Sequence, residues 1–141
     1  MSIDSIKTLL SEKGINPSFQ RLKIYEFLIT KRCHPTVEMI YNELIKEIPT
    51  LSKTTIYNTL NLFQNKGIII GLSIDENEVR YEADLNPHAH FKCTVCKCIY
   101  DIPIEYSEIH EDVIAGHVIT ERHIYLKGIC MRCQEKKKQS L

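Results

Sequence analysis

The chain has 141 residues, with 43% hydrophobic and 26% charged side chains, and its 18 basic and 18 acidic residues give no net charge. This size and composition are typical of one or two small globular domains, and they exclude fibrous and largely disordered architectures. Because neither half of the chain is strongly basic, any nucleic-acid binding has to come from a local surface. No apolar run approaches the roughly 20 residues that span a bilayer. The first residues also lack the pattern of a secretion signal, so we expect a cytoplasmic protein without membrane contact.

The first half of the chain is predicted to be helical. Apolar residues recur at helical spacing in four segments, the first of which ends at Gly14. The second covers residues 18–30 and the third residues 36–48. The fourth runs from its predicted N-cap, Ser52, to Gly67.

A predicted β-hairpin follows these helices. Residues 68–74 are apolar and β-branched, residues 75–77 are typical of a turn, and residues 79–83 can form a returning strand. Helices followed by such a hairpin have the order of a winged helix-turn-helix, and the short connection at residues 48–52 fits the turn of that motif.

Asn86-Pro87 marks the predicted boundary between two domains, residues 1–84 and 85–141. Beyond it we expect strands at residues 90–93, 98–104 and 118–129, with a short helix at residues 107–117. The lysines at 136–138 are predicted to form a frayed, solvated tail. The fold class expected from these elements is α+β.

Four of the six cysteines form two C-x-x-C pairs, Cys93 with Cys96 and Cys130 with Cys133. Two thiolates at this spacing on a tight turn can bind one tetrahedral zinc ion, and two such turns complete a four-cysteine site. Because the protein would fill all four positions, the site would be structural and would stabilise the fold. Cys98 is an alternative ligand to Cys96, although the repeated spacing favours Cys96. The competing interpretations are buried free cysteines and a redox-active C-x-x-C pair.

A second group of candidate metal ligands includes His88 and His90, which alternate along a predicted strand and therefore point to one face. Glu82 and Asp101 lie on likely neighbouring strands, and His34 can join them from the first domain. Such a set of nitrogen and oxygen donors suits ferrous iron, manganese or zinc. Ligands from both domains would let metal occupancy control the orientation of the domains.

Residues 50–67 contain no acidic side chain and combine apolar positions with a face of hydroxyl and amide groups. A helix of this kind can hydrogen-bond phosphates and read base edges in the major groove. The alternative is an ordinary amphipathic helix. The candidate DNA contacts are Gln20, Arg21, Ser52, Lys53, Thr54, Thr55, Tyr57 and Asn58.

Together these residues resemble the ferric uptake regulator family of bacterial metal-dependent repressors, which includes the peroxide repressors. The resemblance extends over nearly the whole chain. It is carried by Gln20-Arg21, His34-Pro35-Thr36, the segment from Ser52 to Leu60, Arg80-Tyr81-Glu82, the segment from His88 to Cys96, Asp101, and the segment from Gly128 to Cys133.

The resemblance implies an N-terminal winged helix-turn-helix domain and a small C-terminal α/β dimerisation domain. It also implies a homodimer, a palindromic DNA operator, and a structural Zn²⁺ on the four cysteines. A regulatory Fe²⁺ or Mn²⁺, with Zn²⁺ as the alternative, would be bound by His34, Glu82, His88, His90 and Asp101. Such a protein is a regulator and not an enzyme.

The chain departs from the family pattern at a further metal site. Pro87 and Ala89 occupy expected ligand positions, Arg122 falls near another, and only Glu108 remains. We therefore predict that this third site is absent, as in the peroxide-repressor branch.

Two other residues bear on the subtype. Asp101 resembles the peroxide repressors, whereas Glu82 stands where they typically carry Asp, and Glu there is associated with weak peroxide reactivity. We expect a peroxide- and iron-responsive repressor, with a reversible iron, manganese or zinc sensor as the alternative. A zinc hydrolase and a thiol-redox protein are remote alternatives, because no nucleophile motif or redox-type βαβ context accompanies the metal ligands.

Overall fold

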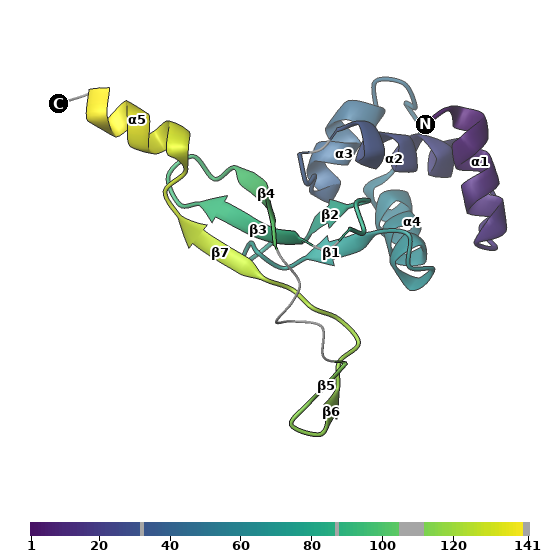
Figure 1. The fold of residues 1–141 in the computed structure, drawn as a ribbon. Helices are drawn as coiled ribbons and strands as arrows, with labels where there is room; N and C mark the ends of the chain where they lie inside the picture. The colour runs from purple at the N-terminus through teal and green to yellow at the C-terminus, as the bar shows by residue number, and fades with distance from the viewer. Residues whose placement is uncertain (32, 87, 105–111, 140–141) are drawn as a thin grey trace. The chain divides into compact units, whose positions relative to one another are not determined.

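The computed structural model describes residues 1–31, 33–86, 88–104 and 112–139. It divides the chain into two compact units, Met1–Leu85 and Asn86–Leu141 (Figure 1). The sequence places the boundary one residue earlier. Across the described residues no helix is long and apolar enough to cross a membrane.

The first unit contains four helices, each of which begins after a serine or threonine. They are α1 (Ile3–Glu12), α2 (Phe19–Thr30), α3 (Val37–Leu44) and α4 (Lys53–Asn65). The side chains of the four preceding residues, Ser2, Ser18, Thr36 and Ser52, each accept a hydrogen bond from the backbone N–H three residues further on. Such N-caps satisfy an N–H group that the helix itself leaves unpaired.

The predicted ends of the helices are largely confirmed. α4 ends at Asn65 and is followed by Lys66 and Gly67, whose φ is 71°, and the N–H of Ile68 donates to the carbonyl of Phe63 over 3.1 Å. This is the Schellman arrangement that stops a helix. α3 is shorter than predicted, because the N–H groups of Glu47 and Ile48 both turn back onto the carbonyl of Leu44.

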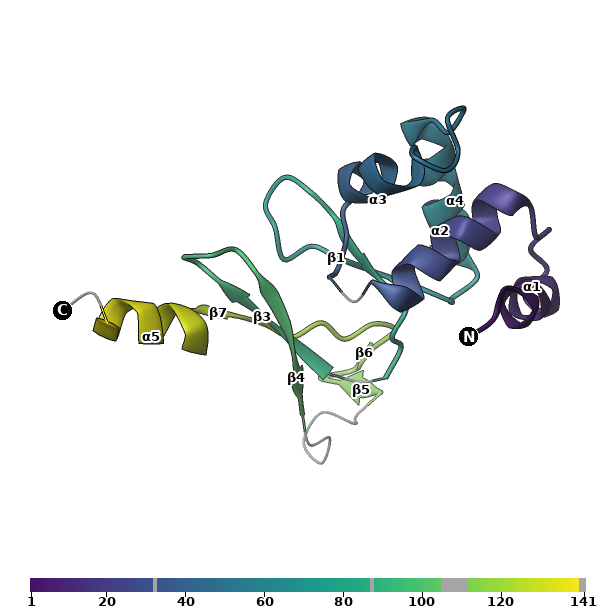
Figure 2. The ribbon, with the colours of Figure 1, turned by 90° about the horizontal axis from the view of Figure 1, so that it is seen from above.

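The core of the first unit lies between the helices, with α2 buried on several sides (Figure 2). Ile24, Ile56, Leu60 and Phe63 are fully buried. The rings of Tyr25 on α2 and Phe63 on α4 meet edge to face at a centroid distance of 5.8 Å. This packing holds α4 in place while its opposite side remains exposed to solvent.

A two-stranded wing completes the first unit. β1 (Ile70–Leu72) pairs antiparallel with β2 (Arg80–Glu82), and Gly71 lies opposite Tyr81. The N–H of Tyr81 also donates to the carbonyl of Pro35 over 2.9 Å. β2 is therefore attached to the segment that precedes α3, and this brings Glu82 close to His34.

The second unit contains a mixed three-stranded sheet in the order β4-β3-β7. Its strands are β3 (His88–Cys93), β4 (Ile99–Pro103) and β7 (Tyr125–Gly128). The central strand, β3, is antiparallel to β4 and parallel to β7. A hairpin of β5 (Val113–Ile114) and β6 (His117–Val118) and a final helix, α5 (Met131–Gln139), complete the unit (Figure 1).

Three predictions about the second unit are wrong. The single strand expected at residues 118–129 is divided, because β6 ends at Val118, residues 119–124 form no strand, and β7 begins at Tyr125. The helix expected at residues 107–117 falls partly on residues 107–111, which lie outside the described residues, and its remainder is the β5–β6 hairpin. Ala115 and Gly116 both have positive φ, 52° and 84°, as the tightest hairpin turns require. The expected frayed tail is instead part of α5, whose sequence contains neither glycine nor proline and whose last turn carries three lysines. Cations are favourable at that end of a helix.

The α+β class is confirmed, with a winged helix-turn-helix arrangement in the first unit and a small α/β unit after it.

Candidate metal centres and nucleic-acid interface

The four predicted zinc ligands converge in the second unit. Cys93 ends β3, Cys96 lies in the turn after it, and Cys130 and Cys133 lie at the start of α5. Their sulfur atoms all lie within 4.8 Å of one another, and Cys96 Sγ and Cys130 Sγ are 3.8 Å apart. Four thiolates at about 2.3 Å from a tetrahedral zinc ion have edges of about 3.8 Å. The geometry thus fits Zn²⁺, with Cys96 rather than Cys98 in the group.

Backbone N–H groups surround the sulfur of Cys93. Those of Val95, Cys96 and Cys130 lie 3.4, 3.5 and 3.4 Å from it. The N–H of Cys130, then those of Cys96 and Val95, lower the pKa of the Cys93 thiol to about 6. Hydrogen bonds to the charged form favour that form. These hydrogen bonds therefore favour the thiolate of Cys93, the form that binds metal.

The hydroxyl of Tyr100, on β4, is the largest cause of a lowered pKa at Cys130. Burial, in contrast, raises the pKa of Cys133 to about 12. Close thiolates cannot all be ionised without a cation between them, whereas a bound divalent ion favours the deprotonated form of each ligand. The donor set is thus suited to a dication.

In the first unit, His34 and Glu82 form one candidate donor pair. Nε2 of His34 lies 3.3 Å from Oε1 of Glu82, and both residues are buried. His34 has a left-handed backbone with a φ of 50°. The Nη1 group of Arg80 donates to the His34 carbonyl over 3.1 Å, and Nε of Arg80 contacts Asp75 Oδ2 over 2.7 Å.

In the second unit, His88, His90 and Asp101 form another donor set. The Nε2 atoms of the two histidines are 2.9 Å apart, and they lie 3.3 and 3.5 Å from Asp101 Oδ1. His90 is paired directly with Asp101 across β3 and β4. Nδ1 of His88 is hydrogen-bonded to the Asn86 carbonyl. If Nδ1 carries the proton, Nε2 is left with a lone pair for a metal.

The residues of the predicted absent third site do not form a donor set that the structure describes. Ala89 is buried in β3, and Arg122 is ion-paired with Asp112 over 3.1 Å. Pro87 and Glu108 lie outside the described residues.

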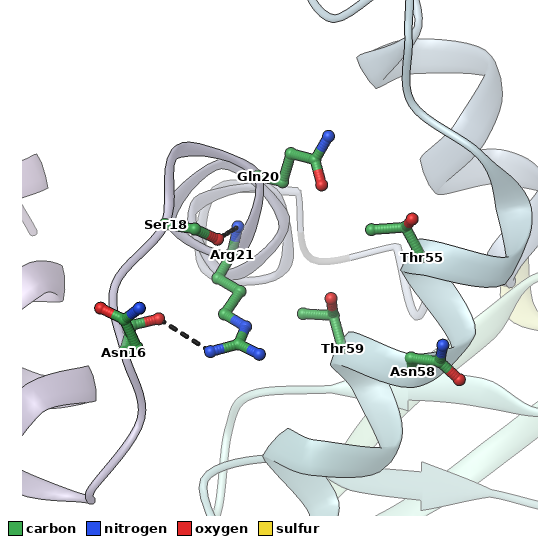
Figure 3. Close-up of a pocket in the computed structure, with 7 residues that line it drawn as sticks. All are labelled: Asn16, Ser18, Gln20, Arg21, Thr55, Asn58 and Thr59. Atoms are coloured by element: carbon green, nitrogen blue, oxygen red, sulfur yellow. Dashed lines mark hydrogen bonds between the residues drawn. The ribbon is translucent and has the colours of Figure 1, made fainter.

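The predicted DNA contacts lie at different places in the first unit. Gln20, Arg21, Thr55 and Asn58 line one polar pocket (Figure 3), whereas Lys53 and Tyr57 line a second pocket beside the wing. Ser52 caps α4, with its Oγ 3.1 Å from the N–H of Thr55. Thr54 is exposed to solvent.

Sequence reasoning missed several residues at these sites. Thr59 belongs to the face of hydroxyl and amide groups recognised in residues 50–67 but was not among the predicted contacts; it lies one helical turn after Thr55 and lines the same pocket. Nothing in the sequence pattern pointed to Tyr100 beside Cys130, or to the bond from Arg80 to the backbone of His34.

Comparisons with known proteins agree with this arrangement. The sequence model of the Ferric uptake regulator family matches residues 12–129. A peroxide-responsive repressor PerR from Staphylococcus saprophyticus is 34% identical over 138 residues, which is 94% of this chain and 91% of that protein. The fold is similar to that of the Helicobacter pylori ferric uptake regulator Fur, whose structure reveals three functional metal binding sites. The TM-score is 0.74, at 20% identity and 95% coverage of both chains. PerR from Streptococcus pyogenes, whose structure addresses peroxide sensing and gene regulation, has a TM-score of 0.54 at 27% identity, covering 94% of this chain and 92% of that one.

Proposed function

Since this chain belongs to the ferric uptake regulator family, we propose that it is a metal-dependent, DNA-binding transcriptional repressor of the peroxide-responsive type. The observation that carries the proposal is one chain's combination of a winged helix unit, a four-thiol cluster and two histidine–carboxylate sets. Relatives at 32% and 34% identity that are peroxide-responsive repressors support the subtype.

The four cysteines are proposed to bind a structural Zn²⁺. Because all four positions of a tetrahedral ion would be filled by thiolates, no position would remain open for water or substrate. The ion would join the turn after β3 to the start of α5 and contribute directly to the stability of the second unit.

The histidine–carboxylate sets are proposed to form one regulatory site. Its ligands would be His34 and Glu82 from the first unit and His88, His90 and Asp101 from the second. Imidazole and carboxylate donors suit Fe²⁺ or Mn²⁺, and Zn²⁺ is the alternative. A metal ion bound by both units can shift the equilibrium between two arrangements of the units only if it binds one arrangement more tightly than the other. This difference in affinity would couple metal binding to DNA binding.

Exposed apolar side chains support a homodimer formed by the second unit. On its strands, Val113, Ile114, Val118 and Leu126 are between 45% and 75% exposed. Val113 lies directly opposite Val118 in the β5–β6 hairpin, and contiguous exposed apolar groups mark interaction surfaces. A two-fold dimer presents its two winged units to the two halves of a palindromic operator.

DNA binding by anaerobic, zinc-loaded protein tests the main proposal. Duplexes selected from a random pool by the Mn²⁺-loaded protein are expected to contain an inverted repeat, and fluorescence anisotropy should show that binding requires the added metal. In His34→Ala, added metal should no longer strengthen DNA binding. The variant should remain a folded dimer that binds DNA weakly. Metal-independent binding by the wild type, or unchanged metal-dependent binding by His34→Ala, would contradict the proposal.

A second candidate function is a reversible metal sensor without peroxide chemistry, and Glu82 favours it. When bound, ferrous iron would supply the electrons that reduce peroxide, and an imidazole beside it would be the group at risk of oxidation. For the peroxide-responsive protein we expect intact mass spectrometry after low peroxide to show one added oxygen atom, mapped to His34 or His88. Unmodified protein that still binds DNA would identify the reversible sensor.

A further inference from the structure

A tyrosine lies directly beside the histidine–carboxylate set of the second unit. In the three-stranded sheet, His90 on β3 is paired with Asp101 on β4 and with Tyr125 on β7 (Figure 1). Side chains of residues paired across neighbouring strands project from the same face of a sheet. The rings of His90 and Tyr125 accordingly lie 6.3 Å apart between centroids, at an interplanar angle of 53°. Tyr125 therefore belongs to the face of the sheet that carries the proposed metal ligands.

The hydroxyl group of Tyr125 is in contact with a base. It lies 3.4 Å from Nδ1 of His123, and Nε2 of His123 lies 3.1 Å from Oε2 of Glu121. An ionised carboxylate only accepts hydrogen bonds, so Glu121 favours the His123 tautomer that carries its proton on Nε2. Nδ1 of His123 then has a lone pair, and this nitrogen accepts the hydrogen bond of the phenol.

Tyr125, His123 and Glu121, here called the tyrosine relay, lead from the metal-binding face to solvent. The side chain of His90 is only 4% exposed, whereas those of His123 and Glu121 are 33% and 78% exposed. A proton that leaves the phenol can therefore reach water through His123. An electron has a short path between the Tyr125 and His90 rings. Oxidation of a phenol releases one electron and one proton, and the relay has an outlet for each.

A second tyrosine of the same sheet, Tyr100, lacks these surroundings. It precedes Asp101 on β4 and so points to the opposite face. It is paired with Phe91 instead of a histidine, and the two rings lie 6.3 Å apart between centroids. Its hydroxyl group contacts Cys130 of the proposed zinc site. Since zinc has no redox chemistry, Tyr100 is the natural comparison for Tyr125.

We propose that Tyr125 is a redox-active residue, which gives up an electron and a proton when hydrogen peroxide is reduced at the regulatory site and thereby protects the ligand histidines. The inference rests on the proposed function, because it takes His88, His90 and Asp101 as ligands of ferrous iron. A phenol whose hydroxyl is bonded to a base can lose both particles together, so that no charge is left on the ring.

The electrons and protons of this step balance. Reduction of one hydrogen peroxide molecule to two water molecules breaks the O–O bond and consumes two electrons and two protons. Bound ferrous iron supplies one electron and becomes ferric. Tyr125 supplies the other electron and becomes a neutral tyrosyl radical. Its O–H bond breaks, and the proton passes to Nδ1 of His123, while the second proton comes from solvent. Without Tyr125, a ligand imidazole has to supply the second electron and is itself oxidised.

Peroxide treatment of two tyrosine variants tests the relay. Full-length protein loaded with zinc and ferrous iron without oxygen receives one equivalent of hydrogen peroxide and is frozen for electron paramagnetic resonance. The wild type should show a tyrosyl radical that is absent in Tyr125→Phe and present in Tyr100→Phe. Peptide mapping should find severalfold more oxygen added to His34 and His88 in Tyr125→Phe than in the wild type.

A second pair of variants tests the base. His123→Leu removes the proton acceptor, so it should lower the yield of the radical severalfold and increase histidine oxidation. His117→Leu, at an exposed position on β6, is the matched control and should behave as the wild type. Zinc content and circular dichroism verify the fold of each variant. Because His123 is on the surface, its replacement keeps the test decisive if Tyr125→Phe does not fold.

The position of the proton on His123 provides a test without iron. Nitrogen NMR of the zinc-loaded protein should find this proton on Nε2. A proton on Nδ1 would overturn the proposal, because that nitrogen could not accept the phenolic proton.

Three results of the peroxide experiment would also overturn the relay. They are oxidised iron without a tyrosyl radical in the wild type, a radical that persists in Tyr125→Phe, and equal histidine oxidation in the wild type and Tyr125→Phe. Each leaves the proposed function intact, because metal-dependent DNA binding is measured separately. Ferrous iron that peroxide does not oxidise would overturn the relay together with the peroxide-responsive subtype. Wild-type protein without metal-dependent DNA binding would contradict the proposed repressor itself.

Discussion

Cys96 and Cys98 are two positions apart, and the structure includes only Cys96 in the four-sulfur group. The turn after β3 explains the difference. The N–H of Lys97 bonds to the carbonyl of Cys93, and Lys97 has a left-handed φ of 66°. The chain then returns to the sheet through a bond from the N–H of Cys93 to the carbonyl of Cys98. The repeated spacing of the cysteine pairs therefore identified the four sulfur atoms that converge.

Thiol titration can test which cysteines bind zinc. In zinc-loaded, reduced protein we expect two of the six thiols, the exposed Cys33 and Cys98, to react quickly with a thiol reagent. The other four should react only after chelation, because a metal-bound thiolate is shielded. Cys98→Ala should retain one zinc ion per chain, while Cys96→Ala should lose it. Zinc loss in the Cys98 variant and retention in the Cys96 variant would reverse the assignment.

Residue identity alone did not reveal how the candidate ligands are supported. The sequence pattern pointed to His34, Glu82, His88, His90 and Asp101 as donors. It did not indicate the left-handed backbone of His34 or the bond that its carbonyl accepts from Arg80. Such contacts join residues that are 46 positions apart, and periodicity carries no information about them.

At the scale of elements, α3 and α4 are linked by an ion pair at the edge of the predicted DNA surface. Nζ of Lys53, the first residue of α4, lies 2.6 Å from Oε2 of Glu38 and 5.2 Å from the ring centroid of Tyr41. Lys53 is one of the few cations near α4, so its partner on α3 competes with phosphate for it.

Glu38→Gln should therefore strengthen binding to duplex DNA by severalfold and make its salt dependence steeper by up to about 0.9 in the slope of log K. Salt-dependent anisotropy measures both effects. Glu43→Gln is a matched control, because Glu43 is on the same helix, has the same 54% side-chain exposure, and pairs with Lys46 instead. An equal gain in both variants would show a general effect of charge and no specific role for the Lys53 pair.

Arg80 links the wing to the loop that carries His34. It contacts Asp75 in the turn between β1 and β2, as well as the His34 carbonyl. A left-handed backbone costs a non-glycine residue about 1–2 kcal/mol, and the Arg80 bond helps to hold that conformation. The side chains of Arg80 and Asp75 are only 17% and 13% exposed.

Arg80→Lys keeps the charge but cannot make both contacts at once. We expect it to weaken binding of the regulatory metal about tenfold while leaving the helices folded, since the His34 loop would lose its fixed conformation. Competition with a fluorescent chelator for Mn²⁺ measures the affinity, and circular dichroism measures the fold. Arg122→Lys, in the Asp112 pair of the second unit, is the control. If both variants bind Mn²⁺ as tightly as the wild type, Arg80 does not support metal binding through the His34 loop.

Among the elements, those with local signals were the predictable ones. The N-caps and the Schellman glycine of α4 are encoded within a few residues, so the positions of α1, α2 and α4 followed from the sequence. The β5–β6 hairpin was missed because Ile109 and Val113 have helical spacing, although Gly116 signalled the turn. α5 was missed because it begins beside Cys130, one of the proposed zinc ligands, and lacks the apolar periodicity that marks most helices.

At the scale of the whole molecule, the two units differ in how they are stabilised. The hydrophobic core lies within the first unit. In the second, the buried residues that the structure describes are limited to Ala89, His90, Cys93 and Cys130. So few buried apolar groups cannot offset the conformational entropy of folding, and small domains of this kind depend on metal ions or oligomerisation.

Removal of the structural zinc ion should therefore unfold the second unit and leave the first unit folded. We expect circular dichroism after chelation to retain most of the helical signal and its unfolding transition, while analytical ultracentrifugation shows loss of the dimer. Cys130→Ser should behave in the same way without chelator. A zinc-free dimer as stable as the zinc-loaded one would contradict this dependence on metal.

The parallel pairing of β3 with β7 also affects the order of folding. Cys93 lies opposite Gly128 in this ladder, so the strands meet only after a long intervening segment has closed into a loop. Contacts this distant in the chain form slowly, whereas helices with neighbouring partners form quickly. The first unit would then be complete while the second still awaits its ion, and the rate at which active repressor accumulates would depend on the zinc supply during folding.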